Sequence, residues 1–257
     1  MLLYRLGPEG FYATVDAEGE LRAVYSDPFK VLPGGWELGR VIESGPRGAL
    51  VPVHPGKIVG IGRNYRAHAE ELGNPVPDEP VIFLKAPTSV IGPEAAIVLP
   101  PESERVEFEG EIAVVLRQQL VRADRDQARR AVLGVTCACD VTARDLQRKD
   151  PCFARAKSFD TFCPLGPAIL VEPDLDDLEV VTRVNGEERQ RGRVESMLFS
   201  ILDLLVYASH MMTLEPGDVV LTGTPEGVGP LTDGDRVEIE VAGVGVLGNP
   251  VEVWRQQ

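Results

Sequence analysis

Residues 106–116, VEFEGEIAVVL, alternate acidic and apolar side chains and predict a β-strand. Because successive side chains of a strand point to opposite faces, Glu107, Glu109 and Glu111 share one face. They are spaced about 6.6 Å apart along the backbone, at roughly 3.3 Å per residue. The same face becomes apolar toward the end of the strand. A strand whose acidic half runs into a buried half fits the floor of a pocket better than an exposed surface.

Carboxylates gathered in this way need either water or a cation. If their tips converge to about 4–5 Å at an effective dielectric near 20, each like-charge pair costs roughly 3–4 kcal/mol. Asp140 ends the predicted strand GVTCACD, where it is either a turn residue or a third ligand. A site of carboxylates without histidine favours a hard cation: Mg²⁺, Mn²⁺ or Ca²⁺. Zinc is disfavoured because strand alternation places Cys137 and Cys139 on the face opposite Asp140.

Composition excludes several classes of protein. The chain has 257 residues and a formal net charge of −14, which argues against nonspecific binding of nucleic acid or of an anionic membrane. The longest apolar run, MLFSILDLLVYASHMM, contains an Asp and is too short to span a bilayer, so it predicts a buried helix over 197–212. The four cysteines form no CxxC pair, and no signal peptide is recognisable. Together these features predict a cytoplasmic protein.

The remaining pattern is rich in strands and contains few helices. Residues 1–52 predict a small β domain, and residues 53–257 predict the larger one. Short helices are expected over NYRAHAEEL, with Asn64 as the N-cap, and over DRDQARRAVL. The tetrapeptide VNGE predicts a hairpin turn. The fold class expected from this order is β-rich α+β.

Three further groups are candidates for chemistry. His68 and Glu71 are three residues apart on a predicted helix, so they share a face, as a general base and its orienting carboxylate do. The alternative is a surface histidine near acids. Lys157 is functional only if the fold gives it a partner in a pocket. The loop TGTPEGVG, residues 222–229, is either a simple tight turn or a set of backbone N–H groups facing an anion.

Several ordered stretches together closely resemble the fumarylacetoacetate hydrolase (fumarylacetoacetase-like) family. The resemblance runs from about residue 55 to residue 250. It implies a mixed β-sandwich roll, a homodimer, and an N-terminal domain like that of bacterial 2-hydroxyhepta-2,4-diene-1,7-dioate isomerase-type members. The stretches that carry it are GRNYRAHAEEL, VIFLKAPTSVIGP, FEGEIAVVL, CDVTARDLQ, AKSFDTFCPLGP, VNGEERQ and LTGTPEGVG.

The resemblance also implies roles for individual residues. Glu109, Glu111 and Asp140 would bind Mg²⁺ or Mn²⁺, with Ca²⁺ as a substitute, while Glu107 would not be a ligand. His68, Glu71 and Lys157 would be catalytic, with the first two on a mobile lid helix. Residues on the substrate side would be Lys85, Arg144, Gln147, Gly223 and Thr224.

The function implied is a metal-dependent reaction of a 2-oxo acid or dienoate dicarboxylate through a stabilised enolate. The favoured activity is 2-hydroxyhepta-2,4-diene-1,7-dioate isomerase, with 5-oxopent-3-ene-1,2,5-tricarboxylate decarboxylase activity as a possible second reaction, in aromatic catabolism. The alternatives are an acylpyruvate or fumarylpyruvate C–C hydrolase and an oxaloacetate decarboxylase. An alternative of another class is a catalytically silent metal-binding module.

Overall fold

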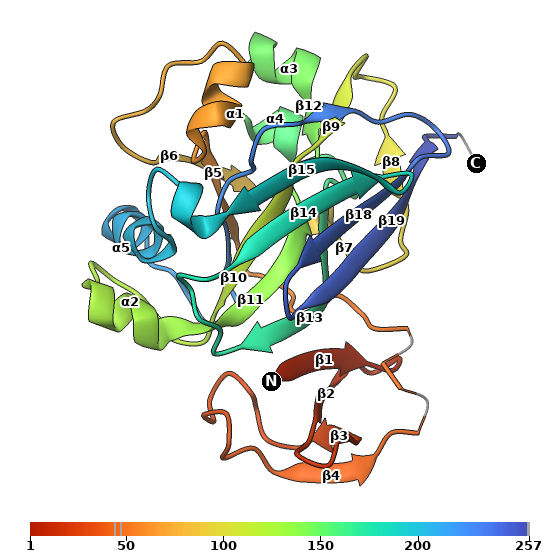
Figure 1. Ribbon diagram of the computed structural model, residues 1–257, viewed down its shortest axis with the longest axis vertical. Helices are drawn as coiled ribbons and strands as arrows, with labels where there is room; N and C mark the ends of the chain where they lie inside the picture. Colours follow the sequence, from red (N-terminus) through yellow and green to blue (C-terminus); the bar gives the residue numbers. More distant parts are fainter. Residues whose placement is uncertain (44, 47, 256–257) are drawn as a thin grey trace.

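The computed structural model describes residues 1–43, 45–46 and 48–255 and is β-rich with few helices, as predicted (Figure 1). An 11-stranded sheet has the order β4-β3-β2-β1-β13-β11-β10-β16-β5-β6, and β7 pairs with β13. Its strands are β1 (Leu2–Leu6), β2 (Phe11–Val15), β3 (Leu21–Val24), β4 (Leu38–Val41), β5 (Ile58–Gly62), β6 (Val81–Lys85), β7 (Val90–Ile91), β10 (Gly110–Leu116), β11 (Val132–Cys139), β13 (Cys163–Val171) and β16 (Val219–Leu221).

Two smaller sheets complete the β structure. One has the order β15-β14-β18-β19-β8, and the other has the order β12-β9-β17. Their strands are β8 (Ile97–Leu99), β9 (Val106–Phe108), β12 (Thr142–Ala143), β14 (Glu179–Val184), β15 (Glu187–Arg193), β17 (Gly229–Pro230), β18 (Arg236–Val241) and β19 (Gly245–Val253). Parallel and antiparallel pairs both occur, so the sheets are mixed.

The main hydrophobic core lies between the large sheet and the five-stranded sheet. Ile112 and Val114 of β10 pack there with Val180 and Ile239 from the opposite sheet, and all four are almost fully buried. Ala113 lies between Ile112 and Val114 in the chain, so its side chain points to the other side of the large sheet and packs in a second core. Since both faces of β10 are covered, the strand is apolar at every position after Glu111.

The strand predicted over 106–116 is interrupted at Glu109, and its two parts belong to different sheets. β9 pairs with β12 and β17, whereas β10 pairs with β11 and β16. The ladder is broken because the Gly110 N–H donates to the side-chain oxygen of Gln190 (3.0 Å) instead of to a neighbouring strand. The predicted alternation of faces survives on both sides of the break.

The helices are short: α1 (Arg66–Glu71), α2 (Arg125–Ala131), α3 (Arg144–Lys149), α4 (Ala154–Lys157) and α5 (Ile201–Met211), with 3-10 turns η1 (Pro87–Ser89) and η2 (Val194–Ser196). The helix predicted from DRDQARRAVL is confirmed as α2, which Asp124 caps in a capping box with Gln127. The apolar run over 197–212 forms α5, which begins only after Ser200 as its N-cap. None of the helices in the described residues combines the length and apolarity that a bilayer crossing requires.

The prediction that Asn64 caps α1 is wrong. The residue preceding α1 is Tyr65, and no side chain caps the helix. The Asn64 side chain instead donates to the carbonyl of Thr222 (2.8 Å) and accepts from the N–H of Phe199 (3.0 Å). These bonds to two distant segments satisfy a fully buried amide, so they prevail over the local cap.

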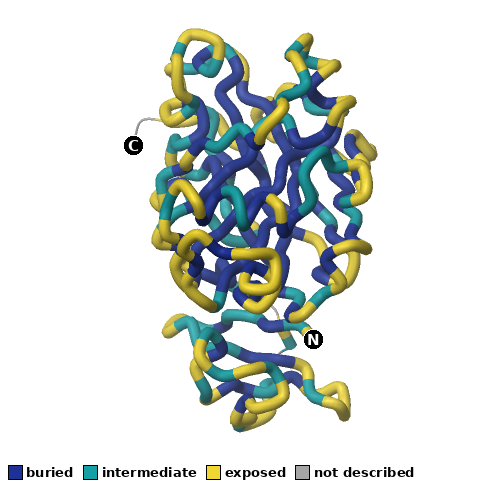
Figure 2. The backbone as a smooth tube through the Cα atoms, turned by 90° about the vertical axis from the view of Figure 1, so that its left-hand side faces the viewer, coloured by how far each residue is buried: buried dark blue, intermediate teal, exposed yellow. Residues whose placement is uncertain are grey.

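The N-terminal strands β1–β4 lie at the end of the molecule opposite α1 and α3 (Figure 1). Antiparallel pairing of β1 with β13 makes them an extension of the large sheet. Their own small core contains Leu6, Ala13 and Leu21, while the densest burial lies in the larger part of the chain (Figure 2). The domain boundary at residues 52/53 stays a prediction.

Candidate metal centre and active site

Glu109, Glu111 and Asp140 converge at the junction of two sheets. Glu109 lies between β9 and β10, and its carbonyl accepts from the N–H of Asp140 (2.8 Å), the residue that follows β11. This bond joins the two chain segments, so all three carboxylates each offer an oxygen within 4.8 Å of the others. Their exposed fractions are only 5%, 1% and 1%. The three carboxylates thus come together in the folded chain, and their role as metal ligands stays a prediction.

Buried cations hold two of the three carboxylates. The Lys157 ammonium contacts Glu109 Oε2 (2.7 Å) and Asp140 Oδ2 (2.5 Å), and Arg144 donates to Glu109 Oε1 (2.6 Å). Burial opposes ionisation of Glu109, but the charges of Lys157 and Arg144 outweigh it, so the pKa of its carboxyl lies below its usual value. Burial likewise opposes the charge of Lys157, yet Asp140 and Glu109 raise its pKa. These four residues therefore form a charged, mutually oriented network.

Glu111 is placed differently. Its carboxylate accepts from the backbone N–H of Gly223 (2.6 Å), and in the described part of the chain no Lys, Arg or His nitrogen lies within salt-bridge distance of it. Burial and the neighbouring charges of Asp140 and Glu109 raise its pKa well above the usual range. A buried carboxylate without a cation, beside two others, is a donor set that fits a hard divalent ion. Glu109, Glu111 and Asp140 could hold that ion.

Glu107 lies outside this cluster. Its carboxylate accepts from Arg105 (2.6 Å) and from Nε of Arg144 (2.7 Å). Because Arg144 also holds Glu109, Glu107 positions the guanidinium that orients a candidate ligand. Glu107 thus affects the site indirectly, through the position of Arg144.

Gly110 separates the two glutamates because the chain approaches the opposite sheet there. A Cβ at this position would lie 1.8 Å from Oγ1 of Thr182 and 3.1 Å from its Cβ. Any side chain would therefore push β10 away from β14. The glycine of this E-G-E stretch is required by packing, and the two acids on either side of it receive their positions from that packing.

We expect Gly110→Ala to lower stability by about 1–3 kcal/mol, the usual cost of overpacking a core, and to weaken divalent metal binding as well. Denaturant unfolding and calorimetric titration with Mg²⁺ would measure the two effects. Adding Thr182→Ala removes the atom that clashes at 1.8 Å and should restore part of both losses. If Gly110→Ala alone were as stable as the wild type, this packing role would be contradicted.

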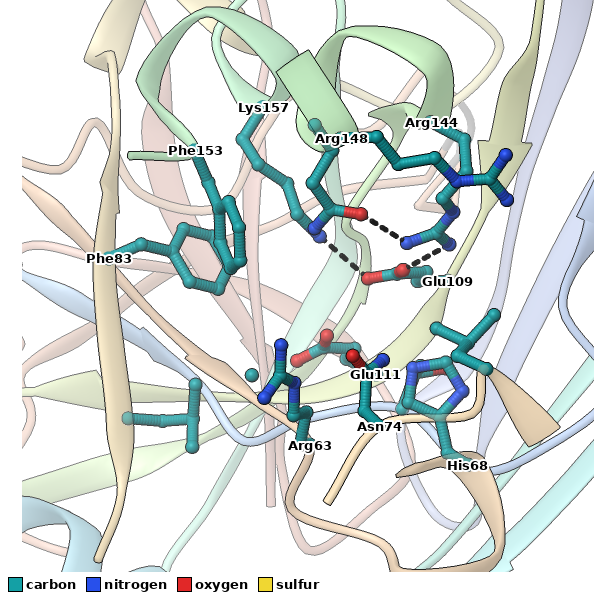
Figure 3. Close-up of a pocket in the computed structure, with 15 residues that line it drawn as sticks. Arg63, His68, Asn74, Phe83, Glu109, Glu111, Arg144, Arg148, Phe153 and Lys157 are labelled. Atoms are coloured by element: carbon teal, nitrogen blue, oxygen red, sulfur yellow. Dashed lines mark hydrogen bonds and ion pairs between the residues drawn. The ribbon is translucent and has the colours of Figure 1, made fainter. Parts of the chain in front are cut away.

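Glu109 and Glu111 of the acidic cluster lie at the floor of a cavity of about 310 Å³, and Asp140 lies behind them. Figure 3 shows Lys157 and Arg144 reaching it from one side, and His68 and Arg63 from the opposite side. Phe83 and Phe153 form an apolar wall, with their rings 5.8 Å apart in an edge-on arrangement. The Lys157 ammonium lies 4.9 Å from the centre of the Phe83 ring. The cavity is thus charged at its floor and apolar along one wall.

His68 and Glu71 of α1 lie close together, as their spacing predicts. Nδ1 of His68 is 3.5 Å from Oε2 of Glu71, and this buried nitrogen makes no hydrogen bond to any described residue. The Glu71 carboxylate accepts from the N–H of Gly227 at 3.1 and 3.2 Å. Glu71 therefore ties α1 to the loop 222–229, and the catalytic roles of His68 and Glu71 stay predictions.

The residues predicted on the substrate side divide into two groups. Arg144, Gln147 and Thr224 line the cavity. Lys85 is fully buried and contacts Asp140 Oδ1 (2.6 Å) and the carbonyl of Val141 (3.3 Å). The N–H of Gly223 is occupied by Glu111. In this structure the last two therefore support candidate metal ligands, and all five roles toward a substrate stay predictions.

Five residues of the cavity do not stand out in the sequence as candidates: Arg63, Asn74, Phe83, Arg148 and Phe153. Arg63 and Phe83 lie inside GRNYRAHAEEL and VIFLKAPTSVIGP, two of the stretches that carry the family resemblance, and this membership is the sequence signal for them. Phe153 and Asn74 lie in loops without a periodic pattern. Only the folded chain brings them to the cavity.

Comparison with known proteins gives consistent results. The family model described as "Fumarylacetoacetate (FAA) hydrolase C-terminal" matches residues 57–252. Oxaloacetate tautomerase FAHD2A, mitochondrial, of Homo sapiens is 43% identical over 215 residues, which cover 79% of this chain and 68% of that protein.

Two solved structures match nearly the whole chain. The 5-carboxymethyl-2-hydroxymuconate delta-isomerase from Mycobacterium smegmatis has a TM-score of 0.88 and 42% identity, and the match covers 99% of this chain and 100% of that one. The 2-hydroxyhepta-2,4-diene-1,7-dioate isomerase from Mycobacterium marinum has a TM-score of 0.87 and 38% identity, with 100% of both chains covered.

Proposed function

Because the chain belongs to the fumarylacetoacetate hydrolase family, we propose that it is a divalent-metal-dependent isomerase of 2-oxo or 2-hydroxy-dienoic dicarboxylates. The favoured substrate is 2-hydroxyhepta-2,4-diene-1,7-dioate, and the second is oxaloacetate, through its keto–enol exchange. The relatives described above are named as isomerases or as a tautomerase. Isomerases and tautomerases of this kind move a proton between an enol oxygen and a carbon atom of the substrate.

One observation carries this proposal: Glu109 and Glu111, two of three clustered buried carboxylates, line the same cavity as His68, which has Glu71 beside it. When bound, a Mg²⁺ or Mn²⁺ ion would supply a Lewis acid that stabilises negative charge on the 2-oxo oxygen. Proton transfer then requires one group that can take up and return a proton, and the cavity offers His68.

The side chains of the cavity have separable tasks. Lys157 keeps Glu109 and Asp140 in place and brings a positive charge to the floor, where an enolate oxygen would accumulate negative charge. His68, with Glu71 beside it, would take the proton of the 2-hydroxyl group of the dienol and deliver a proton to a carbon of the diene, which leaves the 2-oxo form. The phenyl rings of Phe83 and Phe153 would exclude water from the carbon chain.

His68→Ala is expected to slow isomerisation by about 10²–10⁴-fold, the usual contribution of a general acid–base. Decarboxylation of oxaloacetate should fall far less, since loss of CO₂ generates the enolate without a base. Ultraviolet absorbance of the enol would follow both reactions. His210→Ala, which removes an exposed histidine of α5, is the matched control. Equal losses in both reactions would remove His68 from the proton-transfer role.

The experiment that tests the function is an absorbance assay with Mg²⁺ on four substrates: 2-hydroxyhepta-2,4-diene-1,7-dioate, oxaloacetate, acetylpyruvate and fumarylpyruvate. Metal-dependent isomerisation of either of the first two supports the proposal. Cleavage of the last two as the main activity would favour a C–C hydrolase, for which the His68–Glu71 pair could activate water. No turnover of any substrate would favour a silent metal-binding module and contradict the proposal.

Three further points belong to the same proposal. The protein would act as a homodimer, in the cytoplasm, in the breakdown of aromatic compounds. The human relative is named as mitochondrial, so location varies among relatives. Sedimentation and growth on aromatic carbon sources by a deletion strain would test the first and the third.

A further inference from the structure

Some of the positively charged side chains that line the cavity do not contact the acidic cluster. Arg63, Arg144 and Arg148 all line it. The guanidinium of Arg144 is committed to Glu107 and Glu109. In the described part of the chain, neither Arg63 nor Arg148 has a carboxylate oxygen within salt-bridge distance or a side-chain hydrogen bond to protein. An anionic group of a bound molecule could therefore occupy either of these two without displacing an existing partner.

Arg63 is presented to the cavity by an unusual backbone. Its φ is +60°, in the left-handed region, which costs an L-residue other than glycine or asparagine of the order of tenfold in relative population. It follows Gly62 at the end of β5 and precedes the buried Asn64. Glycine or asparagine would adopt this conformation more easily. Arg122 and Glu94 also have positive φ, so the task of Arg63 is inferred from its place in the cavity and from the lack of a side-chain partner among the described residues.

Asn64, the residue after Arg63, is held by hydrogen bonds, and these bonds also fix the backbone that directs the Arg63 side chain. Asn64 bonds to Thr222 and Phe199 through its side chain, and its carbonyl accepts from the N–H of Leu198 (2.8 Å). These bonds anchor the turn between β5 and α1 to the segment before α5 and to the loop 222–229. Figure 3 shows the guanidinium of Arg63 directed into the cavity, on the side opposite Lys157, whereas that of Arg148 is directed away from Glu109.

We propose that Arg63 is the specificity residue that binds the second carboxylate of a dicarboxylate substrate, the one remote from the oxo group. The proposal rests on the function proposed above. It adds the residue that recognises the end of the substrate remote from the oxo group. A 2-oxo acid whose first carboxylate and oxo oxygen occupy the acidic floor carries its remaining charge toward the opposite wall. A carboxylate buried there without a cation would be strongly disfavoured, and a guanidinium matches it in a bidentate manner.

The test compares two nonreacting ligands that differ only at the far end, malate and lactate, by calorimetry with Mg²⁺ present. Wild-type protein should bind malate more tightly. In Arg63→Asn the ratio of the two affinities should fall at least about tenfold, the loss expected for a charge-assisted hydrogen bond. Because asparagine tolerates the left-handed backbone, the thermal midpoint of this variant should equal or exceed that of the wild type.

Two further variants sharpen the test. Arg63→Lys keeps the charge but not the paired donors, so its affinity ratio should lie between those of wild type and Arg63→Asn. Arg66→Asn removes the same charge from an exposed position on α1 and should leave the ratio unchanged. Ligand binding is measured without turnover, so the result stands apart from whether the isomerase assay succeeds.

Three results would overturn the proposal. One is a wild-type protein that binds malate no better than lactate. Another is an Arg63→Asn variant that weakens both ligands equally, which would place Arg63 on the first carboxylate. The third is a clear drop in the thermal midpoint of Arg63→Asn, which would give Arg63 a structural role.

Discussion

Glu111→Gln is expected to reduce turnover by at least about 10³-fold while leaving the metal-free protein as stable as the wild type, or more so. Loss of a ligand oxygen charge weakens binding of a divalent ion, and the charge stabilisation that such an ion supplies is worth several kcal/mol. The fold does not suffer, because Glu111 has no cationic partner among the described residues, and burial together with Asp140 and Glu109 disfavours its charged form. Glutamine keeps an oxygen for the N–H of Gly223.

Three measurements check this expectation: kcat/KM with saturating Mg²⁺, calorimetric titration with Mg²⁺, and thermal unfolding in the presence of a chelator. Glu104→Gln, which removes an exposed glutamate from the loop before β9, is the control and should behave as wild type. If Glu111→Gln kept its turnover with saturating Mg²⁺, Glu111 would not be a ligand. If it unfolded at a much lower temperature with the chelator present, the carboxylate would be structural.

Asp140→Ala should lose both activity and stability. Asp140 is the shared partner of two buried ammonium groups, those of Lys85 and Lys157. Its removal leaves Lys85, whose side chain is fully buried, with only the carbonyl of Val141. Breaking a buried ion pair in this way costs about 3–5 kcal/mol, because an uncompensated charge stays in the interior. Denaturant unfolding with a chelator present isolates this cost from any effect of metal.

A second substitution separates the two losses. In Lys85→Met/Asp140→Ala the stranded ammonium is replaced by an apolar chain of similar length, so most of the stability should return. Activity should stay lost, since the candidate ligand is still missing. Recovery of turnover in the double variant would show that Asp140 acts only as a counterion for Lys85. Failure to recover stability would show that Lys157, and not Lys85, depends on Asp140.

These two variants differ because the three carboxylates, although alike in sequence, have different surroundings. Alternation alone predicts that Glu109 and Glu111 share a face, and this is confirmed. It does not predict that Glu109 is held by Lys157 and Arg144, while the hydrogen bond to Glu111 among the described residues comes from the backbone N–H of Gly223. The partners come from elements far along the chain, so no local pattern identifies them.

The break in the strand at Glu109 illustrates the same limit. The sequence predicts one strand over 106–116, because propensity and alternation are uninterrupted. The structure divides it between two sheets, since Gln190 from β15 takes the hydrogen bond of Gly110. Asn64 is a parallel case, in which distant bonds replace a helix cap. In both places a tertiary hydrogen bond outweighs a local preference.

The amino-acid sequence by itself determined the β-rich class, the family resemblance, the faces of the central strand and the identity of three carboxylates and a histidine–glutamate pair. The strand faces and the proximity of the histidine–glutamate pair follow from periodicity and spacing, which act over a few residues, whereas the set of candidate ligands is what the family resemblance implies. Only the tertiary structure decided which carboxylate lacks a cation, that Lys85 lies behind Asp140, and that Arg63 faces the cavity with no protein partner among the described residues. Such facts depend on burial and on partners distant in the sequence, because a charge in a protein interior is governed by whatever the fold places beside it.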